Sequence, residues 1–418
     1  MLIDVPCTAC GCVCDDLRLS VSDQRVTHVA PGCPLAEQFF ARATGPQAVG
    51  ESVSPTELAA CLDQAATILS QAHAPLIYGL SHSSTPAQQA AVALADRLGA
   101  SIDTNASTCH APSIVALQVS GESTCTLGEI RNRADVVVYW GSNPLVSHPR
   151  HVERFVDAPG MLVPRGRQDR HVIVVDIERT ATADQADIFI QVQPGRDFEL
   201  AWALRSLVQG HRLLQDTIAG VPRSQIEELA LRLQSADFGA LFFGLGVTHG
   251  PVPHLQVEAL LRLVTDLHRH TRWVARRMRI PGDVAGADSV LCWQTGYPFS
   301  VHLGRGYPRY NPGEFSANEL LSRNEVDAML VIGTAGINKL STAALKTVRR
   351  LPTIVLNPPY VTPPWKPTVH FETATYGIHR LGTAYRMDET PLPLRPILNS
   401  SLPADHEILQ ALLTRIQG

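Results

Sequence analysis

Charged residues are scarce in this chain of 418 residues, and neither sign dominates. They make up 18% of the sequence, hydrophobic residues make up 45%, and the net charge at pH 7 is −4. The one dense basic run is "RWVARRMR" (272–279), which is more typical of a solvated helix face or a strand edge than of an anion site. Without a concentrated positive field, the chain is not expected to bind nucleic acid. The low charge fraction indicates instead a subunit whose surface is partly covered by protein partners.

Long apolar runs are also missing. No segment reaches the roughly 20 apolar residues that span a bilayer, and the N-terminus has neither the basic nor the apolar region of a signal peptide. We therefore expect a cytoplasmic protein without a membrane anchor. In that reducing compartment, cysteines that cluster in the sequence are expected to be ligands or redox groups rather than disulfides.

Cysteines do cluster, at the N-terminus. Cys7, Cys10 and Cys14 have the spacing C-x2-C-x3-C, and Cys33 follows in "APGCPLAE". Three thiolates on a tight loop with a distant fourth favour an iron–sulfur cubane, in which each iron takes one sulfur from a different direction. Zinc remains the alternative, although the usual second C-x2-C pair is missing. Cys12 is expected to point away from the four, or to exchange roles with Cys10 or Cys14.

The rest of the chain alternates between short apolar runs, such as "APLIYGL" and "HVIVVD", and amphipathic helices. This rhythm predicts a doubly wound α/β fold with mostly parallel sheets. We expect a Cys-rich cluster module over 1–50, with a hairpin around "SDQR", and an α/β body over 51–418 made of two to three interleaved subdomains. The strands are predicted within 74–80, 134–144, 170–180, 238–250, 326–336 and 351–359, and helices within 54–72, 85–99, 196–210 and 224–236.

Ligands of such sheets bind beyond the carboxyl ends of the strands. Polar and glycine residues that follow the predicted strands are therefore candidates for the cradle of a large cofactor, although each glycine also fits a plain turn. No strict G-x-G-x-x-G is present, which argues against NAD. The candidates are Gly141, Ser142, Asn143, Asp176, Gly244, Gly246, Thr248, His249 and Gly333.

Cys109 and His110 stand in "NASTCHAPSI", just before a helical stretch that begins near Pro112. A helix N-terminus and an adjacent histidine stabilise a thiolate, which suits a nucleophile or a soft-metal ligand. The alternative is a buried structural thiol. Cys61, Cys125 and Cys292 have no such setting and are expected to be packing residues, as is the "HPRH" segment (148–151). No G-x-S-x-G elbow supports Ser-His-Asp hydrolysis.

Many segments together resemble the B subunit of formylmethanofuran dehydrogenase, the tungsten- or molybdenum-pterin subunit of a multi-subunit complex. The resemblance runs from the first cysteine almost to the end of the chain. It is carried by "CTACGCVCDD", "STCHAPSIVALQ", "CTLGEIRNRADVVVYWGSNPLVSHPRH", "GRDFELAWALRSLVQGH", "FGALFFGLGVTHG", "CWQTGYPFSV", "PRYNPGEFSANELL" and "GTAYRMD".

The resemblance implies specific roles. Cys7, Cys10, Cys14 and Cys33 would hold a [4Fe-4S] cluster. Cys109 would be the thiolate ligand of a metal carried by two pyranopterin guanine dinucleotides, with His110 as an acid/base or orienting group and Arg279 as the binder of formate or carbon dioxide. The complex would interconvert carbon dioxide and formate and pass formate to a methanofuran-like carrier. Its other subunits would be an amidohydrolase type, a formyltransferase type and a small β-barrel that covers the pterin, because the chain is expected to lack a C-terminal β-barrel domain.

Several loops depart from the family pattern. After "AMLVIG" the chain continues "TAGINKLS", and after "IVLNP" it continues "PYVTPPWKPTVHFE", where the family has a basic, Thr-rich cofactor loop. A second hypothesis is therefore a non-redox scaffold, the B subunit of a formyltransferase/hydrolase complex that has lost the metal-pterin centre. A third is a thiol-nucleophile enzyme that uses only Cys109 and His110.

Overall fold

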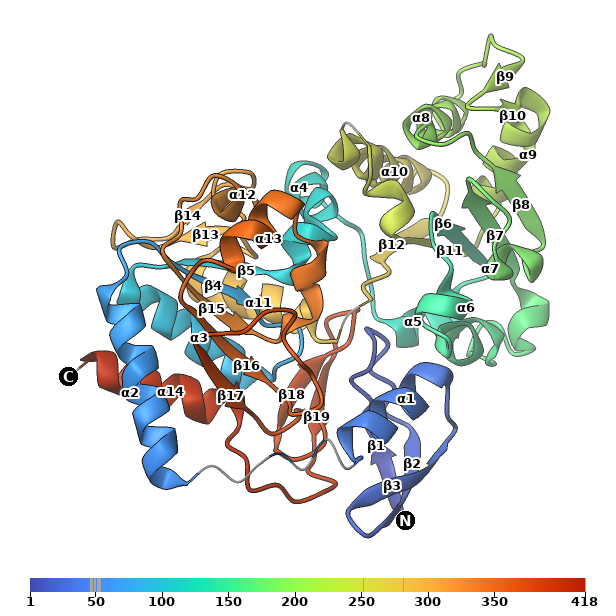
Figure 1. Cartoon of the computed structure of the whole chain (residues 1–418). Helices are drawn as coiled ribbons and strands as arrows, with labels where there is room; N and C mark the ends of the chain where they lie inside the picture. The colour runs from blue at the N-terminus through green and yellow to red at the C-terminus, as the bar shows by residue number, and fades with distance from the viewer. Residues whose placement is uncertain (46–47, 49, 51–53, 251, 281, 418) are drawn as a thin grey trace. The chain divides into compact units, whose positions relative to one another are not determined.

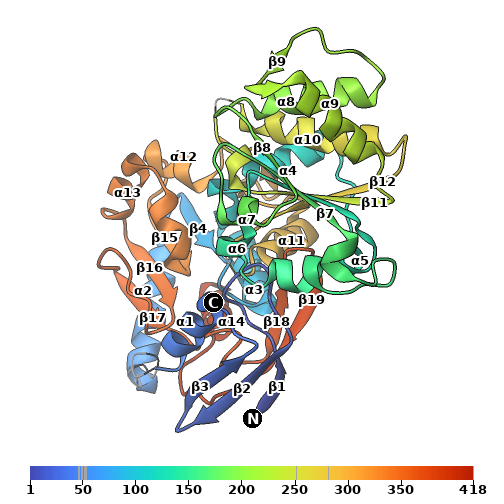
Figure 2. The ribbon, with the colours of Figure 1, turned by 90° about the vertical axis from the view of Figure 1, so that its right-hand side faces the viewer.

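The computed structural model describes residues 1–45, 48, 50, 54–250, 252–280 and 282–417, and the chain divides into two compact units. Unit 1 comprises residues 1–108 and 281–418, and unit 2 comprises residues 109–280. In each unit, helices cover both faces of a mainly parallel sheet (Figure 1, Figure 2). The predicted α/β architecture with parallel sheets is confirmed. Within the described ranges, no helix combines the length and apolarity that a membrane span requires.

Unit 1 contains a seven-stranded sheet in the order β14-β13-β5-β4-β15-β16-β17. The five strands from β5 to β17 are parallel, and β13 and β14 are added antiparallel at one edge. The chain moves from β4 outward to β5 and later returns to the other side of β4, so the winding direction reverses between β4 and β15. The strands are β4 (Pro75–Gly79), β5 (Ser101–Thr104), β13 (Val301–His302), β14 (Arg309–Tyr310), β15 (Ala328–Ile332), β16 (Thr353–Asn357) and β17 (Val369–Glu372).

Alternate residues of these strands build two apolar layers, one on each face of the sheet. Ile77, Leu330 and Ile354 face one layer, which is covered by α2 (Pro55–Gln71), α3 (Thr85–Leu98), α11 (Val284–Thr295) and α14 (Asp405–Gln417). Leu76, Met329 and Val355 face the other, which is covered by α12 (Ala317–Ser322) and α13 (Thr342–Val348).

Two small antiparallel elements complete unit 1. The N-terminal sheet consists of β1 (Leu2–Val5), β2 (Leu17–Ser22) and β3 (Arg25–Ala30) and leads into helix α1 (Pro34–Ala43). Near the C-terminus, β18 (Gly382–Tyr385) and β19 (Pro391–Leu394) form a hairpin. Short 3-10 turns at Asn105–Thr108 and Thr334–Lys339 follow β5 and β15.

Unit 2 contains a five-stranded, fully parallel sheet in the order β12-β11-β6-β7-β8. The winding direction reverses between β6 and β11. The strands are β6 (Val136–Trp140), β7 (His171–Asp176), β8 (Ile188–Gln191), β11 (Phe238–Phe243) and β12 (Arg272–Arg277). A two-stranded ribbon joins β9 (Thr217–Ile218) and β10 (Val221–Pro222).

One face of this sheet packs on four helices through residues such as Val138, Ile173 and Leu241. These helices are α4 (Ala111–Ser120), α8 (Asp197–Val208), α9 (Arg223–Gln234) and α10 (Pro253–Leu267). On strands β6 and β11, Tyr139 and Phe242 stack on each other and contact His151. The remaining helices are α5 (Leu127–Arg133), α6 (Pro144–Ser147), α7 (Ala181–Asp184), a π turn at Glu153–Asp157 and 3-10 turns at Gly166–Asp169 and Leu245–Val247.

Most elements lie where the sequence pattern predicts them. All six strands and all four helices fall within the predicted ranges, allowing one residue at the start of α9, and the hairpin turns at Asp23 and Gln24. Two expectations are wrong. Cys292 is exposed rather than packed. Residues 272–277 of "RWVARRMR" form the edge strand β12, but all of them except Arg272 are buried instead of solvated, with Arg276 only 2% exposed.

Arg170 is a buried cation that connects two backbone segments of unit 2. Its guanidinium donates hydrogen bonds to the carbonyl oxygens of Arg131, Ala134, Val156 and Ala158, which lie on the segments before and after β6. Buried carbonyls that lose their donor keep the full cost of desolvation.

We predict that Arg170→Met lowers the free energy of unfolding by about 3 kcal/mol or more, because four carbonyls lose a charged donor. Urea unfolding followed by circular dichroism measures this change. Arg262→Met is the matched control, since Arg262 forms an exposed pair with Glu258 one helical turn away and should cost less than about 1 kcal/mol. Equal losses in the two variants would contradict this role for Arg170.

Candidate functional site

Three of the N-terminal candidate cysteines lie on the loop between β1 and β2 of unit 1, and Cys33 lies directly before α1. Cys7, Cys10 and Cys14 are buried, and Cys33 is partly exposed. Burial raises the pKa of the Cys7 thiol well above its usual range, and electrostatic coupling to Cys10, Cys14 and Cys33 raises it further. The pKa of Cys33 is raised by burial and by its coupling to Cys10 and Cys14. The four thiols therefore lie close enough to act on one another.

Backbone hydrogen bonds and a buried valine shape this loop. The amide of Cys7 donates to the carbonyl of Cys14 (2.8 Å), and the amide of Val13 donates to that of Cys10 (3.1 Å). Val13 has a φ of +34°, which a β-branched residue rarely adopts. Its side chain is fully buried against the β18–β19 hairpin, so packing holds the backbone in this unfavourable conformation.

The C-terminal part of unit 1 anchors the cysteine loop from outside. The amide of Met387 donates to the carbonyl of Gly11 (2.8 Å), and the hydroxyl of Tyr376 donates to the carbonyl of Thr8 (3.4 Å). Cys33 caps helix α1, because its sulfur accepts from the amide of Ala36. Segments far apart in the sequence thus hold the backbone of the cysteine loop, whereas Cys33 is held locally by α1.

The sequence pattern suggested that Cys12 points away from the other four cysteines, but the structure places it among them. It is 1% exposed, and hydrogen bonding with Cys10 and Cys14 and burial raise the pKa of its thiol well above the usual range. Among the residues described, no three His, Cys, Asp or Glu side chains are arranged to hold a single metal ion. The sulfur ligands of a cubane are bound to different irons, so they need not converge on one point.

The second group of candidates, Cys109, His110 and Arg279, lies in unit 2. Cys109 and His110 are buried and immediately precede α4, with His110 at its N-cap position. Nε2 of His110 lies 3.3 Å from the carbonyl oxygen of Met278, and because a carbonyl only accepts, the ring nitrogen is the donor. Nδ1 of His110 faces the hydroxyl of Ser113 (3.4 Å). This bond joins His110, which follows Cys109, to Met278, which precedes Arg279.

A second histidine holds the same segment. Nε2 of His148 donates to the carbonyl of Arg279 (2.7 Å), and Nδ1 accepts from the hydroxyl of Ser147 (2.8 Å). Burial lowers the pKa of His148 to about 4, so the ring is neutral at pH 7 in the tautomer that these bonds require. Arg279 itself is 3% exposed. "HPRH" is therefore a packing feature, as expected, and it also fixes the backbone of Arg279.

Three glycines meet at the reversal point between β6 and β11. The amide of Gly246 donates to the carbonyl of Gly141 (3.0 Å) and the amide of Gly244 donates to Trp140 (3.0 Å). A Cβ on Gly141, which has a φ of +55°, would lie 3.0 Å from Cα of Gly246, and one on Gly244 would lie 2.5 Å from the carbonyl of Gly141. The loops after β6 and β11 can approach this closely only because these positions carry no side chains.

The other strand-end candidates of unit 2 are Asn143, Asp176, Thr248 and His249. Asn143 accepts a hydrogen bond from the hydroxyl of Thr182 (2.7 Å). Asp176 ends β7, and burial raises its pKa. Thr248 and His249 both bond to the carbonyl of Leu245, and of the two only His249 is exposed. The structure thus places these residues at the carboxyl end of β7 and on the loops that follow β6 and β11.

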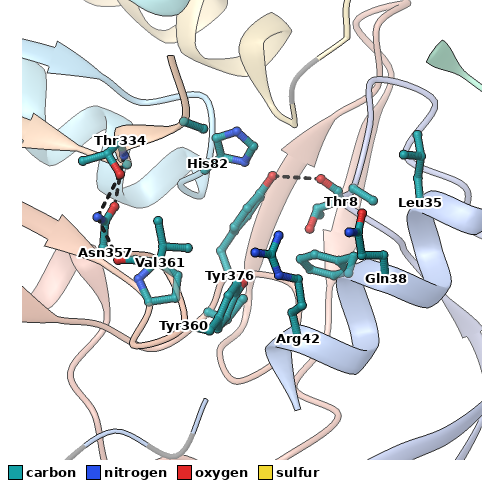
Figure 3. A pocket seen from close by; sticks show the side chains of 16 residues that line it. Thr8, Leu35, Gln38, Arg42, His82, Thr334, Asn357, Tyr360, Val361 and Tyr376 are labelled. Atoms are coloured by element: carbon teal, nitrogen blue, oxygen red, sulfur yellow. Dashed lines mark hydrogen bonds between the residues drawn. The ribbon is translucent and has the colours of Figure 1, made fainter. Parts of the chain in front are cut away.

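Unit 1 has a cavity of about 220 Å³ at its own reversal point, which sequence reasoning missed apart from Gly333. Loops after β4, β15 and β16 contribute His82, Thr334 and Asn357, and the N-terminal segment contributes Thr8 and helix α1 (Figure 3). Asn357 accepts from the amide of Thr334 and donates to its hydroxyl, which fixes the two loops together. The strand-end rule could have found 81–82, 334 and 357, but not the contribution of residues 8–42.

The cavity is largely apolar, with one charged side chain among its described lining residues. Tyr360, Val361 and Tyr376 form an apolar wall, and Arg42 of α1 faces it (Figure 3). Burial lowers the pKa of His82 to about 4 and raises that of Tyr360 to about 12, so both are neutral at pH 7. A ligand with an aromatic body and an anionic group would match these walls.

The chain is 38% identical to the B subunit of the tungsten-containing formylmethanofuran dehydrogenase 2 of Methanocaldococcus jannaschii, over 99% of this chain and 98% of that one. The chain belongs to the family of formylmethanofuran dehydrogenase B subunits. No protein-family model matches it.

Two solved structures share the fold of this family member. A chain of the formyltransferase/hydrolase complex of Methylorubrum extorquens, solved with methylofuran, superposes with a TM-score of 0.71 at 22% identity, over 88% of this chain and 97% of that one. The acetylene hydratase of Pelobacter acetylenicus superposes with a TM-score of 0.69 at 14% identity, over 99% of this chain and 69% of that one. At these identities the likeness concerns the fold alone.

We predict that His148→Gln makes stability less dependent on pH. The unfolded imidazole takes up a proton below about pH 6.5, whereas the folded ring resists it until about pH 4, so wild-type stability falls as the pH drops between these values. From pH 7 to pH 5 the free energy of unfolding of the wild type should fall by about 2 kcal/mol more than that of His148→Gln.

Urea unfolding at pH 5, 7 and 8 measures this difference. Between pH 7 and 8 the two proteins should change in parallel, because the imidazole is neutral in both states. Parallel curves down to pH 5 as well would mean that His148 is not held neutral by the fold.

Proposed function

We propose that this chain is the B subunit of a cytoplasmic complex that interconverts carbon dioxide and formate at a tungsten- or molybdenum-bis(pyranopterin guanine dinucleotide) centre. A [4Fe-4S] cluster on Cys7, Cys10, Cys14 and Cys33 carries the electrons. One observation carries the proposal: the hydrogen bond between His110 and the carbonyl of Met278 ties Cys109 and Arg279 to adjoining backbone segments. Membership of the family agrees with it.

The residues present fit both groups. Four mutually coupled thiols, three of them buried, are the donor set of a cubane. In unit 2, Gly141, Gly244 and Gly246 lie on the loops after β6 and β11, at the reversal point where such sheets bind ligands. These glycines, with Asn143, Asp176, Thr248 and His249 on the same strand ends, would bind one dinucleotide. When bound, the metal-pterin group would supply the two-electron exchange with the carbon atom.

Each of the chain's own candidate residues would have a separate role in this reaction. The thiolate of Cys109 would ligate the metal, and the guanidinium of Arg279 would grip both oxygens of formate. His110 and His148 would orient Arg279 through the backbone of 278–279. Reduction of carbon dioxide takes up two electrons and one proton, and the electrons would enter through the cysteine loop. Residues 1–50 would form the cluster module and residues 51–418 the α/β body.

The product would pass to other subunits. We assign the transfer of formate onto a methanofuran-like amine to an amidohydrolase-type partner, with a formyltransferase-type partner beyond it. A small β-barrel subunit would cover the pterin. The chain itself would bind neither nucleic acid nor a membrane.

One observation favours the alternative of a non-redox scaffold. The cavity of unit 1 is lined by Tyr360 and Val361 where the family resemblance led us to expect a basic, Thr-rich loop. A chain without the metal-pterin centre would assemble with hydrolase and formyltransferase subunits and would not oxidise formate. Metal analysis of the complex separates the two functions.

The complex, purified anaerobically, should contain four irons and one tungsten or molybdenum for each copy of this chain, and should oxidise formate with a viologen dye. Cys109→Ala should lower this activity by at least about a hundredfold without loss of iron, because the metal loses its protein ligand. Cys125→Ala, a partly buried cysteine of the same unit, should stay active. Iron without tungsten or molybdenum, or an active Cys109→Ala complex, would favour the scaffold instead.

Arg279→Lys should raise the KM for formate by about tenfold or more, because an ammonium cannot bind both carboxylate oxygens as a planar guanidinium does. Arg272→Lys, at the exposed start of β12, the strand that precedes Arg279, is the matched control and should leave KM unchanged. Steady-state kinetics together with metal analysis would check this, since equal metal content excludes an indirect loss of the centre. An unchanged KM in Arg279→Lys would remove Arg279 from substrate binding.

A further inference from the structure

The segment between α4 and α5 lies along the outer side of β12, the edge strand of the sheet in unit 2. The amide of Ala275 donates to the carbonyl of Ser123 (2.7 Å), and the hydroxyl of Ser123 donates to the carbonyl of Trp273 (3.1 Å). The guanidinium of Arg276 donates to the hydroxyl of Thr124 (2.6 Å). The segment that follows α4 thus holds the edge strand from outside.

The same segment contributes one partner of a buried ion pair. Oε2 of Glu122 lies 3.1 Å from Nη2 of Arg277, and the two side chains are only 7% and 10% exposed. The other carboxylate oxygen of Glu122 has no hydrogen-bond partner among the residues that the structure describes, so the charge of Glu122 depends on Arg277. Removing one member of a buried pair leaves an uncompensated charge, which is far more costly than neutralising both members.

Together with the hydrogen bond from His110 to Met278, this pair closes a ring in the chain. His110 follows Cys109 and stands at the N-cap of α4, and the C-terminal end of α4 leads directly to Glu122. Arg277 ends β12, and the next residue is Met278, whose carbonyl lies 3.3 Å from Nε2 of His110. Both ends of α4 are therefore attached to the end of β12, one by a hydrogen bond and the other by an ion pair.

We propose that Glu122 is a positioning residue, which through its pair with Arg277 fixes the backbone that carries Arg279 relative to Cys109. The inference rests on the proposed function for the roles of Arg279 and Cys109. Glu122 lies between "STCHAPSIVALQ" and "CTLGEIRNR", two segments that carry the family resemblance, and belongs to neither, so the resemblance assigns it no role.

The backbone transmits the effect of the pair to Arg279. The amide of Arg279 donates to the carbonyl of Arg277 (3.2 Å), so a displacement of Arg277 moves Arg279 as well. His110 and His148 hold this turn through the carbonyls of Met278 and Arg279, whereas Glu122 holds it through the side chain of Arg277. A guanidinium that binds both oxygens of formate must be well placed, and a shift of about 1 Å can cost about a hundredfold. Loss of the pair should therefore weaken the binding of formate.

The first test measures hydrogen–deuterium exchange of the full-length chain by mass spectrometry and needs neither metal nor activity. In Glu122→Gln, amides within 274–280 should exchange about tenfold faster than in the wild type, because a buried arginine loses its counter-charge. Arg277→Gln should have a similar effect. The double variant Glu122→Gln/Arg277→Gln should recover most of the protection, since neither member of the pair then carries a charge. Glu129→Gln, which breaks an exposed pair with Arg133, is the matched control and should leave these amides unchanged.

The second test measures the KM for formate of the complex at equal metal content, at a temperature where all variants are folded. Glu122→Gln should raise KM about tenfold, and the double variant should return it toward the wild-type value. Glu122→Asp keeps the charge but shortens the side chain, and it should raise KM about threefold. This variant decides the question by the same measurement if Glu122→Gln does not fold.

The outcomes separate this inference from the proposed function. Unchanged exchange within 274–280 in Glu122→Gln would overturn the inference. A lower free energy of unfolding with unchanged KM would also overturn it, because the pair would then stabilise only the fold. If Arg279→Lys raises KM and Glu122→Gln does not, the inference alone fails. If the wild-type complex oxidises no formate, the proposed function and the inference fail together.

Discussion

Burial of both faces of each parallel sheet is the constraint on which the rest of the structure depends. Strands such as β6 and β15 present apolar side chains to helices on either side, so neither face can hold polar chemistry. Polar groups are left to the loops, and the loops that follow parallel strands gather at one edge. Where the winding direction reverses, two of these loops diverge and leave room. In unit 1 the cavity lies at this place, whereas in unit 2 the glycine loops of the reversal point lie directly against each other.

The same constraint explains what could be predicted from the sequence. A strand buried on both faces is a continuous apolar run, which can be read without knowing its neighbours, and Gly141 and Asp176 follow such runs directly. Side chains whose partners lie far away in the sequence could not be placed. The arginines of "RWVARRMR" look solvated until Glu122 and Thr124 are seen to pair with Arg277 and Arg276. The link from His110 to Met278 crosses 168 positions and has no local pattern.

The cysteine loop illustrates the difference between composition and conformation. Spacing alone indicated three ligands and a distant fourth, because thiolates are the ligands that iron–sulfur clusters require. The conformation of the loop depends on Tyr376, Met387 and the β18–β19 hairpin, which lie more than 350 positions later in the sequence than the loop. No motif in the first 50 residues encodes these anchors. For the same reason the orientation of Cys12 could not be read from its position between Cys10 and Cys14.

Helix α1 connects the two features of unit 1. Its N-cap is Cys33, and its following turns place Gln38 and Arg42 on the wall of the cavity. Thr8, which follows Cys7, lies on the same wall. Since His82 and Tyr360 are neutral at pH 7, Arg42 supplies the charge that the described lining presents to a ligand. An anionic group bound there would sit against the same helix and loop that carry the thiols. Under the proposed function, occupancy of the cavity and the environment of the cluster would therefore depend on each other through α1 and the loop at Thr8.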